Sequence, residues 1–157
     1  AQIKALNDIL FTRNQDADRY QGPFVLPVTQ KRRTSEFGDR RMYRYIDGET
    51  EKNVHFGIDF GIPRGTPVFA AGGGRIALAD FRISTGWTVV IEHLPGVYSL
   101  YYHLDNLACA KGDTVKTGDL IARSGSTGLS TGPHLHWEFR VNGTAVSPDW
   151  FVGRVLY

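Results

Sequence analysis

The pattern of apolar and polar positions divides the chain near residue 22. Within residues 1–22 the apolar side chains recur at the spacing of one helical face, at Ile3, Leu6, Ile9 and Leu10. Residues 14–21 are polar and are typical of a linker. No segment after residue 22 has a convincing helical period. We therefore predict a short helical appendage or linker over residues 1–22 and a separate domain over residues 23–157.

From residue 23 onward, short apolar runs with strand-like alternation are separated by glycine, proline and asparagine turns. The predicted strands cover residues 24–27, 34–38, 55–60, 67–71, 74–79, 88–94, 97–103, 111–121 and 134–141. Pro95-Gly96 predicts a hairpin between two of them. Residues 39–53 are polar and contain the turn signal Asp47-Gly48, so we expect a long loop there. The pattern predicts a mainly β fold with antiparallel sheets.

Composition agrees with one globular domain. The chain has 157 residues, of which 41% are hydrophobic, and its 18 glycines and 7 prolines fit turn-rich β structure. Cys109 is the only cysteine, so no intrachain disulfide can form. We expect Cys109 to act as a small buried hydrophobe and not as a nucleophile.

Charge gives little support for a nucleic-acid partner, because the net charge is only +2. Residues 31–44 are locally basic, with six Lys or Arg against two Asp or Glu. This segment is either a solvated face or an attractive surface for an anionic polymer such as cell wall. No apolar run approaches the roughly 20 residues of a membrane span, and no signal peptide is recognisable. We expect membrane contact only through parts outside this sequence.

Two short motifs carry the candidate chemistry, His55-Phe-Gly-Ile-Asp59 and His134-Leu-His136. Side chains at even separations share one face of a strand, so each motif presents a polar pair, with Phe56, Ile58 and Leu135 facing the other way. Catalytic zinc keeps three protein ligands and an open position for water. Two histidines and one aspartate could supply them. The remaining histidine and His103 could then hold the water or the developing oxyanion.

The remaining candidates have simpler interpretations. The glycine- and hydroxyl-rich segment 124–133 runs directly into the second motif, so we expect it to line the site. His93 has no partner at a useful spacing and is expected to be structural. The glycine run at residues 72–74 lacks the Lys-Ser/Thr of a phosphate loop. The strand aromatics are expected in the core, namely Tyr98, Tyr101, Tyr102, Trp137 and Phe139.

Taken in order, the motifs resemble the lysostaphin-type (LytM-like) zinc endopeptidases of peptidoglycan, over about residues 22–150. The matching segments are residues 35–38, 55–60, 63–68, 70–72, 102–104, 112–118, 125–128 and 130–136. The resemblance implies antiparallel sheets forming a groove, as in duplicated-hybrid-motif folds. It implies one Zn²⁺ held by His55, Asp59 and His136, with His103 and His134 as catalytic histidines. It also implies a peptidoglycan cross-link as substrate, and a periplasmic, envelope or secreted location.

Two alternatives stay open at the level of sequence. Some members of this family have lost catalysis and only activate another wall hydrolase, although all five positions are filled here. A biotinyl or lipoyl carrier domain could explain the turns of residues 112–121, but Lys111 and Lys116 lack the setting of a modified lysine. Residues 43–53 are expected to form one wall of the groove. The substrate-binding residues, the bond cut and the oligomeric state are not determined by the sequence.

Overall fold

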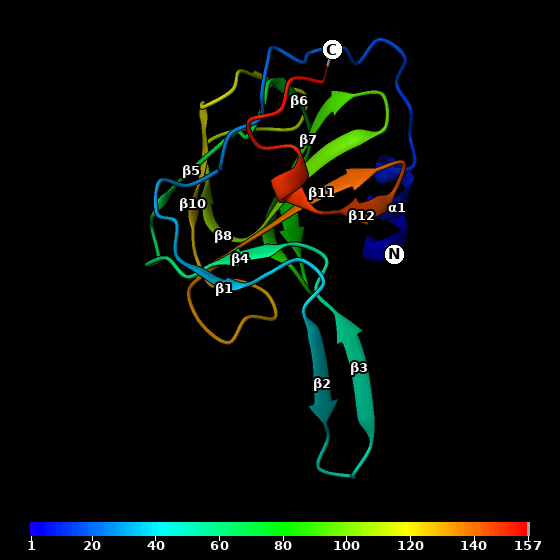
Figure 1. Ribbon diagram of the computed structural model, residues 1–157, viewed down its shortest axis with the longest axis vertical. Helices are drawn as coiled ribbons and strands as arrows, with labels where there is room; N and C mark the ends of the chain where they lie inside the picture. Colours follow the sequence, from blue (N-terminus) through cyan, green and yellow to red (C-terminus); the bar gives the residue numbers. More distant parts are fainter. Residues whose placement is uncertain (157) are drawn as a thin grey trace.

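The protein, described here from a computed structural model over residues 1–156, is built mainly of antiparallel strands (Figure 1). The elements are α1 (Gln2–Leu10), β1 (Arg33–Ser35), β2 (Arg40–Arg44), β3 (Thr50–Val54), β4 (Ile58–Phe60), β5 (Pro67–Phe69), β6 (Gly74–Arg82), β7 (Gly86–Leu94), β8 (Val97–Leu107), β9 (Thr114–Val115), β10 (Leu120–Ser124), β11 (Leu135–Val141), β12 (Thr144–Val146) and the 3-10 helix η1 (Pro148–Trp150). The predicted mainly β fold is confirmed. Among the described residues, no helix is long and apolar enough to cross a membrane.

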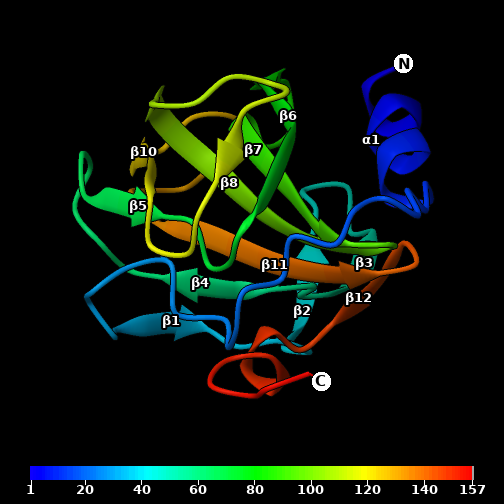
Figure 2. The same cartoon turned by 90° about the horizontal axis from the view of Figure 1, so that it is seen from above.

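One large sheet forms the body, with the strand order β1-β4-β11-β8-β7-β6-β9. Strand β10 pairs with both β5 and β8, and β12 pairs with β11. The predicted hairpin at Pro95-Gly96 is present, because β7 and β8 pair in antiparallel fashion across it. Figure 2 shows β4 and β11 side by side, with β8 and β7 continuing the layer. Strands that are far apart in sequence therefore meet at the centre of the sheet.

Alternation along β11 separates the two faces of the sheet. Leu135, Trp137 and Phe139 are fully buried in the main apolar core, whereas His136 and Glu138 lie on the opposite, outer face. The five strand aromatics expected in the core are all buried. The expectation that Leu135 faces away from the polar pair is confirmed, and Ile58 packs in the same core.

Phe56 does not follow the corresponding expectation. Its side chain is 47% exposed and lies beneath the guanidinium of Arg140, whose carbon is 5.3 Å from the ring centroid. The reason is that residues 55–57 precede strand β4 and do not share its alternation. The strand rule therefore cannot be extended back to Phe56.

The predicted N-terminal helix is present as α1 and packs on the outer face of the sheet. Leu10 is buried against Tyr98 and Leu100, with Leu6 beside it. Further along the chain, the backbone N–H of Arg19 donates to the carbonyl of His93, 3.1 Å away. The boundary at residue 22 between an appendage and the domain stays a prediction.

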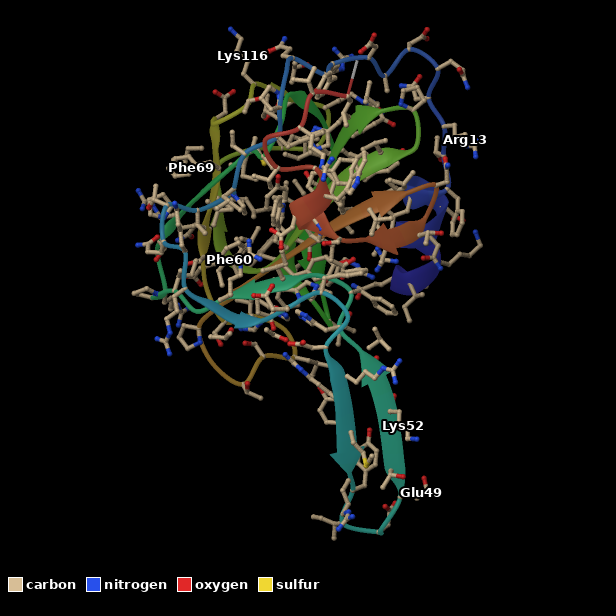
Figure 3. The ribbon with its side chains drawn as sticks, viewed as in Figure 1. Arg13, Glu49, Lys52, Phe60, Phe69 and Lys116 are labelled. Atoms are coloured by element: carbon tan, nitrogen blue, oxygen red, sulfur yellow. The ribbon has the colours of Figure 1, made fainter. Side chains whose placement is uncertain are left out.

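The expectation of a loop at residues 39–53 is wrong, because β2 and β3 form a two-stranded hairpin that projects from the body. Figure 3 shows Glu49 and Lys52 on this hairpin, away from the strand that carries Phe60. All ten strand residues are exposed. A hairpin with no buried face lacks the apolar alternation by which a strand is identified. The predicted turn at Asp47-Gly48 is present, and Gly48 has a φ of 87°.

Cys109 is only partly buried and packs against the main core. Burial raises the pKa of its thiol to about 11, and the nearby carboxylate of Asp113 adds to this effect. The thiol is therefore protonated at neutral pH, which agrees with the expectation that Cys109 is not a nucleophile.

His93 is a structural histidine, as expected. Its ring is fully buried, with Nδ1 2.7 Å from the Gly73 carbonyl and Nε2 2.7 Å from the hydroxyl of Ser99. The carbonyl requires a proton on Nδ1, so Nε2 accepts from Ser99. Burial lowers the pKa of His93 to about 4, and the bond to Gly73 offsets only part of this effect.

Stability is expected to fall in acid because of His93. The unfolded chain takes up the proton near the ordinary pKa of 6.5, whereas the folded protein takes it up only near 4, so the free energy of unfolding decreases as pH falls between these values. At pH 4.5 the loss from this residue is about 2–3 kcal/mol relative to pH 7. Urea unfolding of the wild type and His93→Gln at both pH values measures it. Equal pH dependence in the two proteins would contradict this account.

Candidate metal centre

Strand pairing itself brings Asp59 to His136. The two residues are direct partners across the β4–β11 pair, so their side chains leave the sheet on the same face, the outer one. Asp59 Oδ1 lies 2.8 Å from His136 Nδ1, and both side chains are largely buried. Two residues that are 77 positions apart in sequence are therefore directly paired across adjacent strands of the sheet.

His55 reaches the same point from the segment before β4, and Gly57 makes this path possible. A Cβ at Gly57 would lie 2.3 Å from the Trp137 carbonyl oxygen, so any side chain there would clash with β11. The chain consequently passes close over β11 and places His55 Nε2 3.0 Å from Asp59 Oδ1. The same nitrogen lies 3.1 Å from His136 Nδ1.

The three donor atoms form a triangle suited to a single ion. Their separations are 3.1, 3.0 and 2.8 Å, and the residues that supply them are His55, Asp59 and His136. Zinc bonds of about 2.0–2.1 Å in a tetrahedron place donors about 3.3 Å apart. Small outward shifts of the side chains would accommodate zinc. Two imidazoles and a carboxylate are also ligand types that zinc takes in catalytic sites.

Hydrogen bonds fix which nitrogen of each histidine faces this point. The Nδ1 of His55 lies 2.8 Å from the Glu36 carbonyl and must donate to it, which leaves the lone pair on Nε2. His136 has the reverse orientation, because its Nε2 lies 2.8 Å from Glu138 Oε1 and its Nδ1 faces Asp59. Arg140 in turn holds Glu138 through contacts of 2.8 and 2.7 Å. Such carboxylate–histidine pairs orient metal ligands.

Glu138 and Arg140 are site residues that the sequence analysis missed. Both continue the even spacing of His134 and His136 along β11, so they leave the sheet on the same face. That parity is a signal that could have identified them, because a carboxylate two residues beyond a histidine on a strand lies beside its ring.

Without a metal, the cluster shares a proton. Burial alone would raise the pKa of Asp59, but the hydrogen bond from His136 and the close approach of His55 hold this pKa well below its ordinary value. Burial likewise lowers the pKa of His136, yet the bonds to Asp59 and Glu138 outweigh it and raise this pKa to about 9. A metal ion must therefore displace a proton from His136 before Nδ1 can bind it.

His103 lies beside the triangle because an irregularity in β8 turns its side chain to the opposite face of the sheet. Its neighbour Tyr102 stacks on the His136 ring, with centroids 5.1 Å apart, so strict alternation would turn His103 into the core. Instead His103 has a φ of 60°, and the β7–β8 register shifts between Trp87 and Val89. This β-bulge redirects the imidazole toward the outer face. A positive φ is uncommon for residues other than glycine, and such residues are often found at functional sites.

The segment 124–133 positions both remaining histidines, as expected for a segment that lines the site. The Thr127 carbonyl lies 2.7 Å from His103 Nδ1, and the Gly132 carbonyl lies 2.8 Å from His134 Nδ1. Each carbonyl requires a proton on Nδ1, so each Nε2 carries the lone pair. The ring centroids of His103 and His134 are 4.7 Å apart, and His134 Nε2 is 3.9 Å from Asp59 Oδ1. All five residues named from the sequence therefore meet at one place.

His103 stays neutral at neutral pH. Burial lowers its pKa to about 4, an effect opposed by the bond to Thr127 and increased by the neighbouring histidines. A neutral imidazole with a fixed Nδ1 proton can accept a proton or a hydrogen bond at Nε2.

The base of the β2–β3 hairpin lies next to the donor triangle. Tyr43, Asn53 and Val54 line a small hollow together with Arg41 and His55. This contact places one end of residues 43–53 beside the donor triangle. That the hairpin forms a wall of a substrate groove stays a prediction.

Comparison with known proteins agrees with this geometry. The sequence matches the family described as "Peptidase family M23" over residues 53–148, which is more than half of the chain. The chain belongs to peptidase family M23. Every residue of the triangle and both further histidines fall inside the matched segment.

The M23 chain is 39% identical over 138 residues to peptidoglycan DD-endopeptidase ShyA of Vibrio cholerae, a match that covers 85% of this chain and 31% of that protein. The chain therefore spans less than a third of the length of this curated relative. Among solved structures, a zinc-containing peptidase from Vibrio cholerae is 35% identical, with a TM-score of 0.72 over 81% of this chain and 39% of that chain. The catalytic domain of lysostaphin from Staphylococcus simulans is 33% identical, with a TM-score of 0.66 over 76% and 90% of the respective chains.

The donor triangle offers the ligand types of a zinc site, and one of the similar solved structures is a zinc-containing peptidase. The family membership leaves the carrier-domain alternative without support. The predicted lysostaphin-type resemblance is confirmed.

The hydrogen bond between Glu138 and His136 is expected to tune zinc affinity. A Glu138→Gln variant keeps the shape but loses the negative charge, so His136 is a poorer ligand, and we expect zinc to bind about 10- to 100-fold more weakly. Competition with a chromogenic chelator measures the affinity. Glu92→Gln is the matched control, because Glu92 is also a buried carboxylate beside an arginine, Arg75, but belongs to a different cluster. Unchanged affinity in Glu138→Gln would contradict this role.

Proposed function

We propose that this chain is a zinc-dependent endopeptidase that hydrolyses peptide cross-links of bacterial peptidoglycan. The observation that carries the proposal is the triangle of His55, Asp59 and His136 with two further histidines, His103 and His134, directed at the same point. Clusters of metal ligands are common in proteins. A cluster flanked by two imidazoles with fixed tautomers is suited to moving protons during hydrolysis.

In this proposal His55, Asp59 and His136 hold the zinc, and His103 and His134 are the catalytic residues. When bound, zinc lowers the pKa of water and polarises a carbonyl. In the overall reaction the amide C–N bond breaks, the water oxygen bonds to the carbonyl carbon, and one water proton reaches the leaving nitrogen. His103 and His134 can accept and return that proton, because each offers a lone pair at Nε2.

The substrate part of the proposal draws support from similarity. A relative named as a peptidoglycan DD-endopeptidase and the lysostaphin catalytic domain share sequence or fold with this chain. We infer action outside the cytoplasm, where peptidoglycan lies, in the periplasm, the envelope or the medium. The local excess of positive charge in residues 31–44 would favour approach to an anionic wall polymer.

A non-cleaving regulator is less favoured by the structure. Loss of catalysis in such a protein would be expected to leave at least one ligand or histidine position unfilled or displaced. Here all five side chains are present, and the hydrogen bonds that orient them are intact.

Digestion of purified muropeptides tests the proposal. We expect the zinc-loaded protein to convert cross-linked dimers into monomers, with a mass gain of one water for each bond cut. Mass spectrometry of the products identifies the bond. If dimers stay intact while the protein stimulates a separate wall hydrolase, the regulator alternative replaces the proposal.

A further inference from the structure

A polar pocket lies beside the metal-binding residues. It has a volume of about 320 Å³ and is lined by Thr34, Arg41, Asp59, Gly61 and residues 131–134. Among the described residues that line it, Arg41 is the only permanent cation. Asp59 contributes the only carboxylate, and this group also belongs to the donor triangle. The pocket therefore presents one arginine to whatever enters it.

Arg41 comes from the base of the projecting hairpin and is only partly used by the protein. Its Nη2 lies 3.3 Å from Asp59 Oδ2, which is a long contact, and its side chain is 44% exposed. The other oxygen of Asp59 faces His55 and His136. The hydroxyl of Tyr43 is a second partner of the guanidinium. Because a guanidinium has five N–H donors, most of the hydrogen-bonding capacity of Arg41 is available beyond these two partners.

Stability does not explain this arginine. A half-exposed ion pair at 3.3 Å contributes at most about 1 kcal/mol to stability. Arg33, on strand β1, differs from Arg41 because both terminal nitrogens of its guanidinium are engaged in ion pairs within the protein. It forms a two-point pair with Asp149, with both contacts at 2.7 Å, and a third contact with Glu36.

The position of His134 indicates which part of a substrate enters the pocket. His134 lines the pocket and is also one of the two histidines that can give a proton to the leaving nitrogen. When His134 gives this proton, a substituent on the carbon next to the nitrogen lies beside the pocket. If the substituent is a carboxylate, its carbon lies only about 2.5 Å from the nitrogen, given the standard bond lengths.

We propose that Arg41 determines specificity by binding a free carboxylate on the carbon that bears the leaving nitrogen. Arginine matches a carboxylate with two parallel N–H···O bonds. The substrate class is then an amide in which the amine half is an amino acid with a free carboxylate next to the scissile nitrogen, as in a cross-link from D-Ala to a diamino diacid. In a glycine bridge the corresponding carbonyl is a neutral amide. This inference rests on the proposed function and extends it.

Matched substrates test the inference. One is a cross-linked muropeptide dimer with the free carboxylate next to the scissile nitrogen, and the other is the same dimer with a carboxamide there. We expect the wild type to prefer the carboxylate by about 100-fold in kcat/KM, because a charged hydrogen-bonded pair is lost in the amide. In Arg41→Gln this ratio is expected to fall to within about threefold of one, and Arg41→Lys should retain part of it.

Arg40→Gln is the control for lost charge. Arg40 precedes Arg41 on β2, so alternation turns its side chain to the other face of the hairpin, and it does not line the pocket. Both variants remove one positive charge from the same strand. Arg40→Gln should keep the wild-type ratio, and each variant is checked for one bound zinc.

Binding of the amine product distinguishes failure of the inference about Arg41 from failure of the proposed endopeptidase function. Calorimetry with the zinc-loaded protein compares the diamino diacid peptide with its carboxamide. If the wild type cleaves both dimers equally, the inference is overturned while the proposed function stands. If neither dimer is cleaved, but the carboxylate product binds more tightly and Arg41→Gln removes that difference, the proposed function is overturned and only the binding of the carboxylate by Arg41 stands. Equal binding of both products overturns the inference.

Discussion

Asp59→Asn is expected to remove both zinc and activity. Asparagine has the shape of aspartate, so the β4–β11 pairing should persist, but a neutral amide is a poor zinc ligand. We expect the zinc content to fall from one ion per chain to near zero and wall cleavage to fall by roughly 10³-fold or more, since the chemistry depends on the metal. Metal analysis of the purified protein and a muropeptide assay measure the two effects. His55→Ala and His136→Ala should give the same result.

Asp149→Asn is the control for this experiment. Asp149 is also a carboxylate, paired with Arg33 rather than with histidine, and lies outside the donor triangle. It should keep both zinc and activity. Full activity in Asp59→Asn at the wild-type zinc content would remove Asp59 from the metal site.

His103→Ala and His134→Ala are expected to keep zinc and lose activity. Neither ring belongs to the donor triangle, so the metal should stay bound. Loss of a group that moves protons in the transition state costs about 10²- to 10⁴-fold in rate. Zinc content and kcat, measured on the same preparation, separate these variants from the ligand variants.

The backbone at His103 requires a second variant. Its φ of 60° is strained for alanine, so a loss of activity in His103→Ala could reflect a shifted strand. Asparagine adopts positive φ more readily, and His103→Asn should retain the fold while losing the imidazole. His93→Gln, a substitution of a histidine remote from the triangle, should keep both zinc and activity. Wild-type kcat in His103→Asn would contradict a catalytic role for His103.

Strand parity explains why much of the site could be predicted from the sequence. Asp59 and His136 lie on strands, His134 directly precedes β11, and even spacing along a strand determines which side chains share a face. The pairing of β4 with β11, however, follows from the whole sheet and not from either motif. The resemblance to a family supplied that long-range information.

Features that break local periodicity could not be predicted. His103 reaches the site through a positive φ and a β-bulge. The residue types in β8 predict neither of these two features. The β2–β3 hairpin has the polar pattern of a loop because its strands are exposed on both faces. The contact of Arg41 with Asp59 depends on the geometry of this hairpin, so it could not be predicted either.

The location of the metal in a crystal of the zinc-loaded protein tests the central claim most directly. Data collected on both sides of the zinc absorption edge show the ion as an anomalous difference peak. We predict a single peak within about 2.2 Å of His55 Nε2, an Asp59 carboxylate oxygen and His136 Nδ1, with His136 Nε2 still on Glu138. A peak elsewhere, or one bound by the Nε2 of His136, would contradict the account.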